Sequence, residues 1–472
     1  MPSGPSRNRL TKFKRAFGGD NRYYAAAAWI WRTPVSNVDE PLRPKQRIVP
    51  WIVLSALIGL VAAPAMSVVN VTHSPPSDSP TTMATPATAP ATRPLSRRGN
   101  FLTYLPGMVD RSKVLDTPQA FDAGTFENCR VISSAPPRIV LADTNERSFP
   151  REGQWTTPVM QADIPFTEFI PYWNADVPPD CGISVEASVR DHATGKWSPW
   201  LFVGDWGRPL PAEHLEHFDG GDLRVDNLQL THPADAFAFR VHFNSYALEP
   251  KIIPDLRRLG VLYSGVVPPN EQQKWKVAST EPTGWVRDLP VPYRAQGDLP
   301  RSLSSQCCSP TSVSMVLAYW GIDRPLAENA MGIYDSEHQL FGNWNRAVQY
   351  PASLGLDAWL KRFRNWNDVK AEIASGTPVI ASIKFNAGEF PSEVLKSSKG
   401  HLIVVRGFTA AGDAICNDPG RRGIGKDVIY KADELGHAWF DKSGVGYVIR
   451  APAATKVEPT SQPAKPLLTA GK

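Results

Sequence analysis

The sequence has little net charge beyond its N-terminal segment. Its 472 residues include 51 Lys and Arg against 46 Asp and Glu, a formal net charge of +5. Residues 1–47 alone hold ten basic and three acidic residues, a net charge of +7, which leaves −2 for the rest of the chain. Because the folded part has no basic excess, nucleic acid is not an expected partner.

The sequence also lacks the signatures of a nucleotide site and of a metal site. Residues 420–427, GRRGIGKD, resemble a phosphate-binding loop, but Asp427 stands where Ser or Thr would hold magnesium, and a strand rather than a helix is expected next. The pair His214 and His217 in EHLEH has no third ligand, and nearby prolines disfavour the helix that this spacing needs. We therefore expect no cofactor, no nucleotide and no metal.

Charge is absent from Ile48 to Thr72. A run of roughly 20 apolar residues is long enough to cross a bilayer. The motif Ala63-Pro64-Ala65 also resembles a signal-peptide cleavage site, and the basic residues before the run favour a cytoplasmic N-terminus. We expect a signal anchor or a cleaved signal peptide at 48–71, so that the rest of the chain is extracytoplasmic: periplasmic, on the cell surface or secreted.

Segments of low complexity divide the remainder of the chain. Residues 72–99 and 453–472 are rich in Pro, Thr, Ser and Ala, and such segments cannot bury enough apolar surface to fold. The expected order is a basic cytoplasmic segment (1–47), the hydrophobic segment (48–71), a linker (72–99), an all-β domain (100–270), a second linker (271–285), an α+β domain (286–452) and a disordered tail (453–472).

In the expected β domain, apolar residues occur at every second position of several stretches, and no convincing amphipathic helix is found. Apolar residues alternate over 183–189 and again over 237–243, which predicts half-buried strands in an antiparallel sandwich or jelly roll. Trp197, Trp200 and Trp206 suit the core and rim of such a sandwich better than a sugar-stacking surface.

Cysteine is scarce, with five in the chain. Cys129 and Cys181 both fall in the expected β domain and could form a disulfide in an oxidising compartment. The sequence does not fix their separation, so the paired and the free states both stay open.

Cys308 has the surroundings of a reactive thiol. Ser309 can cap a helix and Pro310 suits its first turn, apolar residues follow at helical spacing, and Gly321 ends the pattern. Cys308 is therefore expected immediately before a helix N-terminus, where free N–H groups favour a thiolate. Nothing similar favours Cys307.

A histidine and a carboxylate are expected together further along the chain. His401 begins an apolar run, residues 409–413 form a turn, and Ala414–Asn417 read as a second strand. In a hairpin that turns there, the residue numbers of each cross-strand pair add up to about 820. His401 and Asp418 add up to 819, so they should lie opposite each other, and Asn417 should point to the other face. His338 and His437 are weaker candidates for a base, because neither begins an apolar strand opposite a carboxylate.

The motifs CSPTSVSMVLAYWG, GHLIVVRGF and CNDPG, in this order, resemble the papain-like cysteine peptidases of the C-39-like group, relatives of the double-glycine leader peptidases. The resemblance covers roughly residues 286–450. It implies a papain-like α+β fold with Cys308 as nucleophile, His401 as general base and acid, and Asp418 as the residue that orients His401. It also implies a Gln that donates to the oxyanion, for which we take Gln296.

We therefore expect an exported cysteine peptidase that hydrolyses peptide bonds of a peptide or protein substrate through an acyl-enzyme. Two alternatives stay open. The same residues could serve an amidase or acyl transferase that acts on cell-wall peptides, or the domain could be a catalytically inactive extracellular binding protein.

Overall fold

The computed structural model describes residues 104–143, 149–210, 214–247, 252–275, 279–392 and 394–452, all within one compact unit. The predicted segments 1–47, 48–71 and 72–99 and the predicted tail 453–472 lie outside these ranges. Within them, no helix combines the length and the apolar character that crossing a bilayer requires.

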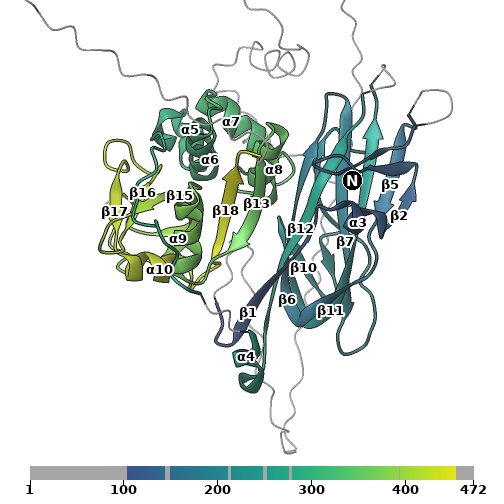
Figure 1. Ribbon diagram of the computed structural model, residues 1–472, viewed down its shortest axis with the longest axis horizontal. Coiled ribbons are helices and arrows are strands. Elements are labelled where there is room, and N and C mark those ends of the chain that lie inside the picture. Colours follow the sequence, from purple (N-terminus) through teal and green to yellow (C-terminus); the bar gives the residue numbers. More distant parts are fainter. Residues whose placement is uncertain are drawn as a thin grey trace, which may run out of the picture. The chain divides into compact units, whose positions relative to one another are not determined.

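The N-terminal part is a β domain, as predicted (Figure 1). Its strands pair antiparallel in the order β2-β5-β11-β6-β12-β4-β3, with β1 on β12, β7 on β11, β8 on β7, β10 on β11 and β9 on β10. Two short helices, α3 (Pro118–Asp122) and α4 (Pro269–Trp275), flank it. The strands are β1 (Met108–Leu115), β2 (Thr125–Glu127), β3 (Cys129–Ile132), β4 (Arg138–Leu141), β5 (Glu152–Thr156), β6 (Met160–Asp176), β7 (Cys181–Asp191), β8 (Leu201–Gly207), β9 (His217–Phe218), β10 (Gly221–Arg224), β11 (Asn227–Ser245) and β12 (Asp255–Val266).

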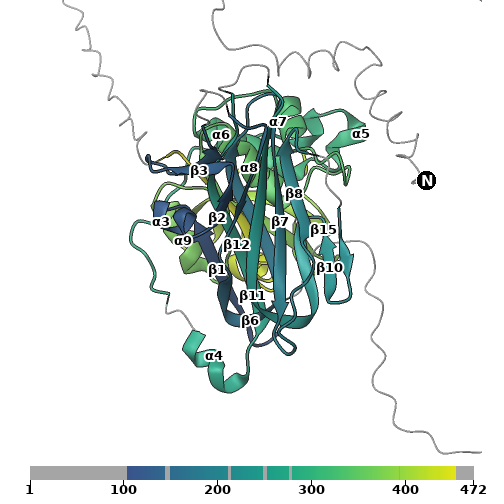
Figure 2. The same ribbon diagram turned by 90° about the vertical axis from the view of Figure 1, so that its right-hand side faces the viewer.

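The two alternating stretches pair with each other in this domain. β7 runs antiparallel to β11, and Figure 2 shows them side by side; Ile183 pairs with Phe243 and Val185 with Val241. The apolar set of each strand is buried, as the alternation predicts. Two of the three tryptophans fit core and rim: Trp206 is buried, and Trp200 is partly buried with the Arg240 guanidinium 4.6 Å from its ring. Trp197 does not, because it is 41% exposed.

No disulfide joins Cys129 and Cys181, which are both free and buried. Cys129 begins β3 and pairs with Leu141 of β4. Cys181 begins β7, pairs with Ser245 of β11, and its thiol lies 3.5 Å from the Ser245 hydroxyl. Of the two states that the sequence left open, the structure shows the free one: each thiol is enclosed by its own strand partners, and burial raises the pKa of the Cys129 thiol to about 12.

The C-terminal part combines an antiparallel six-stranded sheet, in the order β13-β18-β14-β15-β16-β17, with six α-helices (Figure 1). The strands are β13 (Asp357–Arg362), β14 (Val379–Phe385), β15 (Ser398–Phe408), β16 (Ala414–Asn417), β17 (Val428–Tyr430) and β18 (Val445–Arg450). The helices are α5 (Arg301–Ser304), α6 (Cys308–Tyr319), α7 (Leu326–Ile333), α8 (Trp344–Ser353), α9 (Trp366–Ala374) and α10 (Ala432–Trp439), preceded by the 3₁₀ turn η1 (Gln296–Asp298).

The β domain and the C-terminal domain share one continuous core of buried apolar residues. α8 packs against β6, and the Gln349 side chain bonds both the N–H and the C=O of Ala175, at 2.9 and 2.8 Å. Asn174 likewise bonds the C=O of Ala358 at 2.7 Å. These side chains satisfy buried main-chain groups across the junction, so the two domains are docked by specific hydrogen bonds as well as by apolar burial.

A buried ion pair lies at the same junction. Arg362 of β13 donates to Glu168 of β6, and the side chains of both are almost fully buried. Arg364 donates to Asp110 of β1 at 2.6 Å.

Candidate active site

α6 places the Cys308 thiol at its first residue. The predicted helix is present, but it begins at Cys308 rather than after it, and Cys307 occupies the N-cap position without a side-chain cap. Ser309 does not cap the helix as predicted; its buried hydroxyl lies 3.3 Å from the Tyr447 hydroxyl of β18. The helix ends as predicted, because Gly321 adopts φ +85° and donates to Ala318 C=O while Ile322 donates to Leu317 C=O.

α6 is fixed against the strand that carries His401. The Ser312 hydroxyl, one turn after Cys308, donates to the C=O of Leu402 at 3.0 Å. The main chain of Leu402 is also among the groups that lower the pKa of the Cys308 thiol. The residue next to His401 therefore ties α6 to β15.

β15 and β16 form the predicted hairpin, but in a shifted register. Val405 pairs with Cys416 and Gly407 with Ile415, so the strands slip by one residue at Arg406. Paired positions sum to 821 and 822 rather than about 820, and His401 does not pair directly with Asp418.

The two side chains meet all the same, because the chain turns immediately after the last paired residue, Asn417. His401 Nε2 lies 2.6 Å from Asp418 Oδ1, and both residues are buried. Asn417 bonds the C=O of Val291 at 2.9 Å and not His401, in agreement with its predicted direction.

The thiol and the imidazole act on each other electrostatically: His401 lowers the pKa of Cys308, and Cys308 raises the pKa of His401. Cys308 is thus near the pair that His401 and Asp418 form.

Electrostatics in this cluster favour an ion pair between sulfur and imidazole. Burial opposes the thiolate, but the hydrogen bond and charge of His401 and the N–H groups of Leu402 and Ser309 outweigh it, so the pKa of the Cys308 thiol falls below its ordinary 9.0. Burial opposes the imidazolium too, yet the carboxylate of Asp418 and the sulfur of Cys308 raise the pKa of His401 to about 10. Both shifts favour a thiolate beside an imidazolium over the neutral pair.

Cys307 has the opposite environment. It is buried in a small apolar cluster with Leu299, Leu303, Ala330 and Phe341, and it is free. Burial and the neighbouring Cys308 raise the pKa of its thiol to about 12. The neighbouring thiol is therefore neutral and shielded.

Gln296 lies in η1, close to the Asp418 segment. Its N–H donates to the C=O of Pro419 at 2.9 Å. Its side-chain Oε1 is buried without a hydrogen-bond partner among the residues that the structure describes. The structure thus places Gln296 beside the cluster and shows no hydrogen bond from it to Cys308 within the same residues.

Sequence analysis missed two residues that contact Asp418. The Gly420 N–H donates to Oδ1 at 2.8 Å, and the Tyr430 hydroxyl of β17 donates to Oδ2 at 2.8 Å. A methyl group at Gly420 would lie 3.0 Å from Asp418 Oδ1 and 3.3 Å from His401 Nε2. The turn sequence Asp-Pro-Gly is a signal for the contact with Gly420. The short strand Val-Ile-Tyr carries no signal for the contact with Tyr430.

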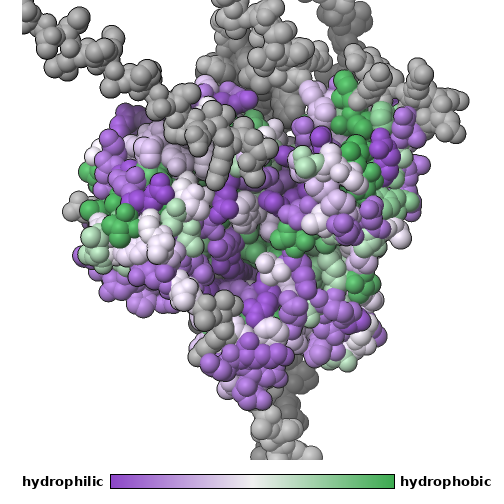
Figure 3. Space-filling model, in the orientation of Figure 1, coloured by the Kyte–Doolittle hydropathy of each residue, from purple (hydrophilic) through white to green (hydrophobic). Residues whose placement is uncertain are grey.

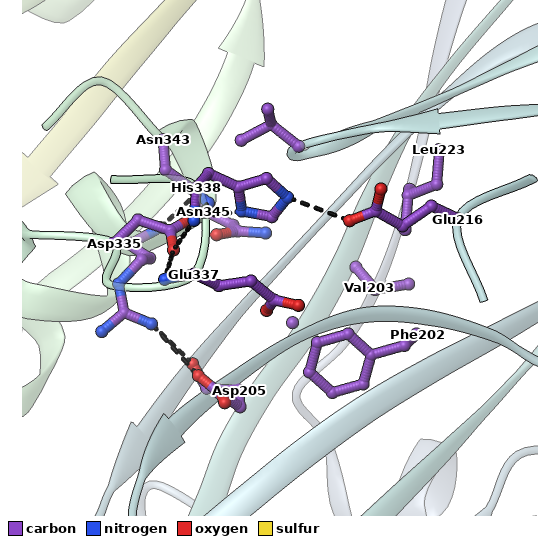
Figure 4. A pocket seen from close by; sticks show the side chains of 13 residues that line it. Phe202, Val203, Asp205, Glu216, Leu223, Asp335, Glu337, His338, Asn343 and Asn345 are labelled. Carbon is purple, nitrogen blue, oxygen red and sulfur yellow. Dashed lines mark hydrogen bonds and ion pairs between the residues drawn. The ribbon is translucent and has the colours of Figure 1, made fainter. Parts of the chain in front are cut away.

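The other histidines serve other contacts. His338 lies between Asp335, at 2.9 Å, and Glu216 of the β domain, at 3.2 Å, beside a cavity of about 20 Å³ (Figure 4). Its hydrogen bond with Asp335 raises the pKa of His338 to about 9, so it is a cation at the domain junction. His437 bonds Asp441 at 2.5 Å on the surface.

The pair His214 and His217 does not share a site. His214 bonds Glu337, and His217 bonds Asp222 at 2.5 Å. Across the part of the chain that the structure describes, no group of three or more His, Cys, Asp or Glu side chains is arranged to hold a metal ion.

Several solved structures resemble parts of the chain. A double glycine motif protease from an AMS/PCAT transporter, in complex with its leader peptide, is 20% identical over 36% of this chain and 97% of its own, with a TM-score of 0.25. A putative C39-like peptidase from Bacillus anthracis is 17% identical over 35% of this chain and 98% of its own, with a TM-score of 0.27. A family 29 carbohydrate binding module is 11% identical over 33% of this chain and 92% of its own, with a TM-score of 0.16.

The comparison with protein families covers both domains. No curated protein matches the chain. Residues 288–445 match the Peptidase_C39 like family, and residues 111–264 match the Peptidase C39 N-terminal domain. The two matches fall within the two domains described above and include Cys308, His401 and Asp418. Residues 288–445 thus form a C39-like peptidase domain, and residues 111–264 form the N-terminal domain that accompanies it.

Proposed function

We propose that the protein is a cysteine peptidase of papain-like design that cleaves peptide bonds with Cys308 as nucleophile, His401 as general base and acid, and Asp418 as the residue that orients His401. The observation that carries the proposal is the buried imidazole of His401, which has Asp418 Oδ1 at 2.6 Å and lowers the pKa of the Cys308 thiol through its hydrogen bond and charge. A nucleophile, a base and an orienting carboxylate in contact form the arrangement that nucleophilic catalysis by cysteine requires.

The proposed reaction has two halves. The Cys308 thiolate attacks the peptide carbonyl, the C–N bond breaks, and the His401 imidazolium gives its proton to the departing amine. A water molecule then loses a proton to His401 and attacks the thioester carbonyl. The C–S bond breaks, the peptide acid is released and the thiolate returns to its pair with the imidazolium.

Gln296 is the proposed oxyanion donor, together with the main-chain N–H of Cys308. The position of η1 supports this role, because η1 is tied to Pro419, directly after Asp418. The donor would be the Gln296 side-chain N–H, since the side-chain oxygen can only accept. Loss of one oxyanion donor costs roughly 3 kcal/mol of transition-state stabilisation.

The proposed setting is extracytoplasmic. Its support is the uncharged run from Ile48 to Thr72, preceded by a segment with a net charge of +7.

The test uses the full chain, its Cys308→Ala variant and, as a matched control, Cys307→Ala. Each is incubated with a peptide library, and mass spectrometry records new termini. We expect cleavage by the wild type and by Cys307→Ala and none by Cys308→Ala. Cleavage that persists in Cys308→Ala would contradict the proposal.

Two further outcomes would favour a different function. If an added amine such as glycinamide is appended to the substrate and hydrolysis is not seen, the protein is an acyl transferase. If no substrate is cleaved and Cys308 reacts with iodoacetamide no faster than free cysteine near neutral pH, the domain is a binding module.

A further inference from the structure

Asp418 is held from both sides of its carboxylate. Oδ1 accepts hydrogen bonds from His401 and from the Gly420 N–H, whereas Oδ2 accepts one from the Tyr430 hydroxyl at 2.8 Å. Asp418 and Tyr430 are both buried. A buried carboxylate with several donors is held in one orientation and in its charged form.

The Tyr430 hydroxyl is in turn fixed by Ser392, in the segment between β14 and β15. Its single proton goes to Asp418, so the Ser392 hydroxyl, at 3.1 Å, donates to the tyrosine oxygen. The Ser392 oxygen accepts from the N–H groups of Val394 and Leu395, at 3.1 and 3.3 Å. The hydrogen bonds therefore run in one direction, from main-chain N–H groups through two hydroxyls to the carboxylate.

We propose that Tyr430 is a positioning residue for catalysis, which fixes the carboxylate of Asp418 so that its other oxygen stays directed at His401. This inference rests on the proposed function. Tyr430 does not touch the reacting sulfur; it acts through Asp418, and Asp418 acts through the imidazole.

The ring of Tyr430 and its hydroxyl have separate roles. The ring packs against Phe390, with 4.8 Å between the ring centroids, and a phenylalanine would keep that packing. Only the O–H reaches Asp418. Tyr430→Phe therefore separates positioning from packing.

The matched control is Tyr350→Phe. Tyr350 is also buried in the C-terminal domain, and its hydroxyl bonds Asn329 Oδ1 at 3.1 Å, a contact outside the cluster at Cys308. Both variants lose one buried tyrosine hydroxyl and the hydrogen bond that it donates; Tyr430→Phe also loses the bond from Ser392. They differ in whether that bond ends on Asp418.

The experiment measures kcat and KM on a cleaved peptide, and the rate of Cys308 alkylation by iodoacetamide against pH, for the full-length wild type and both variants. For Tyr430→Phe we expect kcat to fall about tenfold with little change in KM, because a misaligned base slows the chemical step and not binding. We also expect the acid limb of the alkylation profile to move up by about half a pH unit, since Asp418 loses a donor that favours its charged form. Tyr350→Phe should match the wild type in both.

The outcomes separate this inference from the proposed function. If Tyr430→Phe keeps the wild-type kcat and alkylation profile while Cys308→Ala is inactive, the inference is wrong and the peptidase proposal stands. If Cys308→Ala stays active, the peptidase proposal fails, and the alkylation profile still reports whether Tyr430 acts on the sulfur–imidazole pair.

A second variant tests the inference even if Tyr430→Phe folds poorly. Ser392→Ala removes the donor that fixes the tyrosine hydroxyl and leaves Tyr430 and Asp418 in place. We expect a smaller shift of the alkylation profile in the same direction. An unchanged profile would count against the inference.

Discussion

His401 Nε2 and Asp418 Oδ1 lie 2.6 Å apart, in a hairpin whose strands slip by one residue between them. The contact depends on the turn that follows Asn417, where the Asp418 N–H donates to the C=O of Gly425 at 2.7 Å. That turn brings the carboxylate back toward β15. The contact is thus made by a local loop, and changes to this loop should affect catalysis before they affect folding.

Asp418→Asn should lower kcat strongly. The amide keeps the shape of the side chain but removes the charge that supports the imidazolium, and it can hold His401 in the wrong tautomer. In a serine protease the equivalent change costs about 10⁴ in kcat, and we expect a loss of about 10³ or more here. Steady-state kinetics measure this. Asp413→Asn, in the turn of the same hairpin, should retain activity; an equal loss there would point to a folding defect.

The pH profile of Cys308 should be that of an ion pair. The pKa of the Cys308 thiol is lowered from 9.0, so its thiolate persists to lower pH than that of a free cysteine. The pKa of His401 is raised to about 10, so the imidazolium is lost as pH rises through about 10. We expect alkylation of Cys308 to be already fast near neutral pH and kcat/KM to decline above about pH 10. Mass spectrometry of the alkylated peptide distinguishes Cys308 from Cys307. An alkylation midpoint at or above 9 would contradict the ion pair.

Gly420→Ala should damage the site without unfolding the protein. The added methyl would lie 3.0 Å from both Asp418 Oδ1 and Val394 Cγ1, closer than ordinary contact, so the carboxylate must shift. We expect kcat to fall about tenfold. Gly297→Ala is the matched control, because no atom lies within 4 Å of a methyl group at that position. Equal activity of the two variants would show that the Gly420 turn can move freely.

For the buried pair Arg362 and Glu168, removal of one charge should cost more stability than removal of both. Glu168→Ala leaves the buried Arg362 charge with Asp110 alone, 3.5 Å away, and we expect a loss of about 3 kcal/mol in the free energy of unfolding. The double change Glu168→Leu with Arg362→Leu should lose markedly less. Chemical denaturation measures both. The exposed pair Arg208 and Asp180 provides the contrast, with an expected effect below about 1 kcal/mol. A double variant less stable than Glu168→Ala would refute this account.

Short-range patterns predicted much of the site. The helix at Cys308, its end at Gly321 and the hairpin that carries His401 and Asp418 each depend on residues within about twenty positions, where spacing and turn chemistry are informative. The register was missed because a slip at one residue leaves no mark in the alternation of apolar side chains.

Long-range contacts could not be predicted in the same way. Arg362 and Glu168 are 194 positions apart, and no periodicity links them. The free state of Cys129 and Cys181 likewise depends on which strands enclose each thiol. Tyr430 was missed because its role depends on its hydroxyl oxygen, which reaches Asp418. The pattern of its strand indicates only that the ring is buried.

The continuous core across α8 and β6 has a consequence for protein engineering. Modules joined only by a flexible tether can be cut apart and recombined, whereas here the Gln349 side chain occupies the hydrogen-bonding groups of Ala175 in the neighbouring module. Expression of residues 279–452 alone would expose to water the face of α8 that packs on β6, and the Gln349 side-chain amide would lose its partner Ala175. The two domains should therefore be expressed together, and chimeras that exchange the β domain must carry over the matching residues of α8.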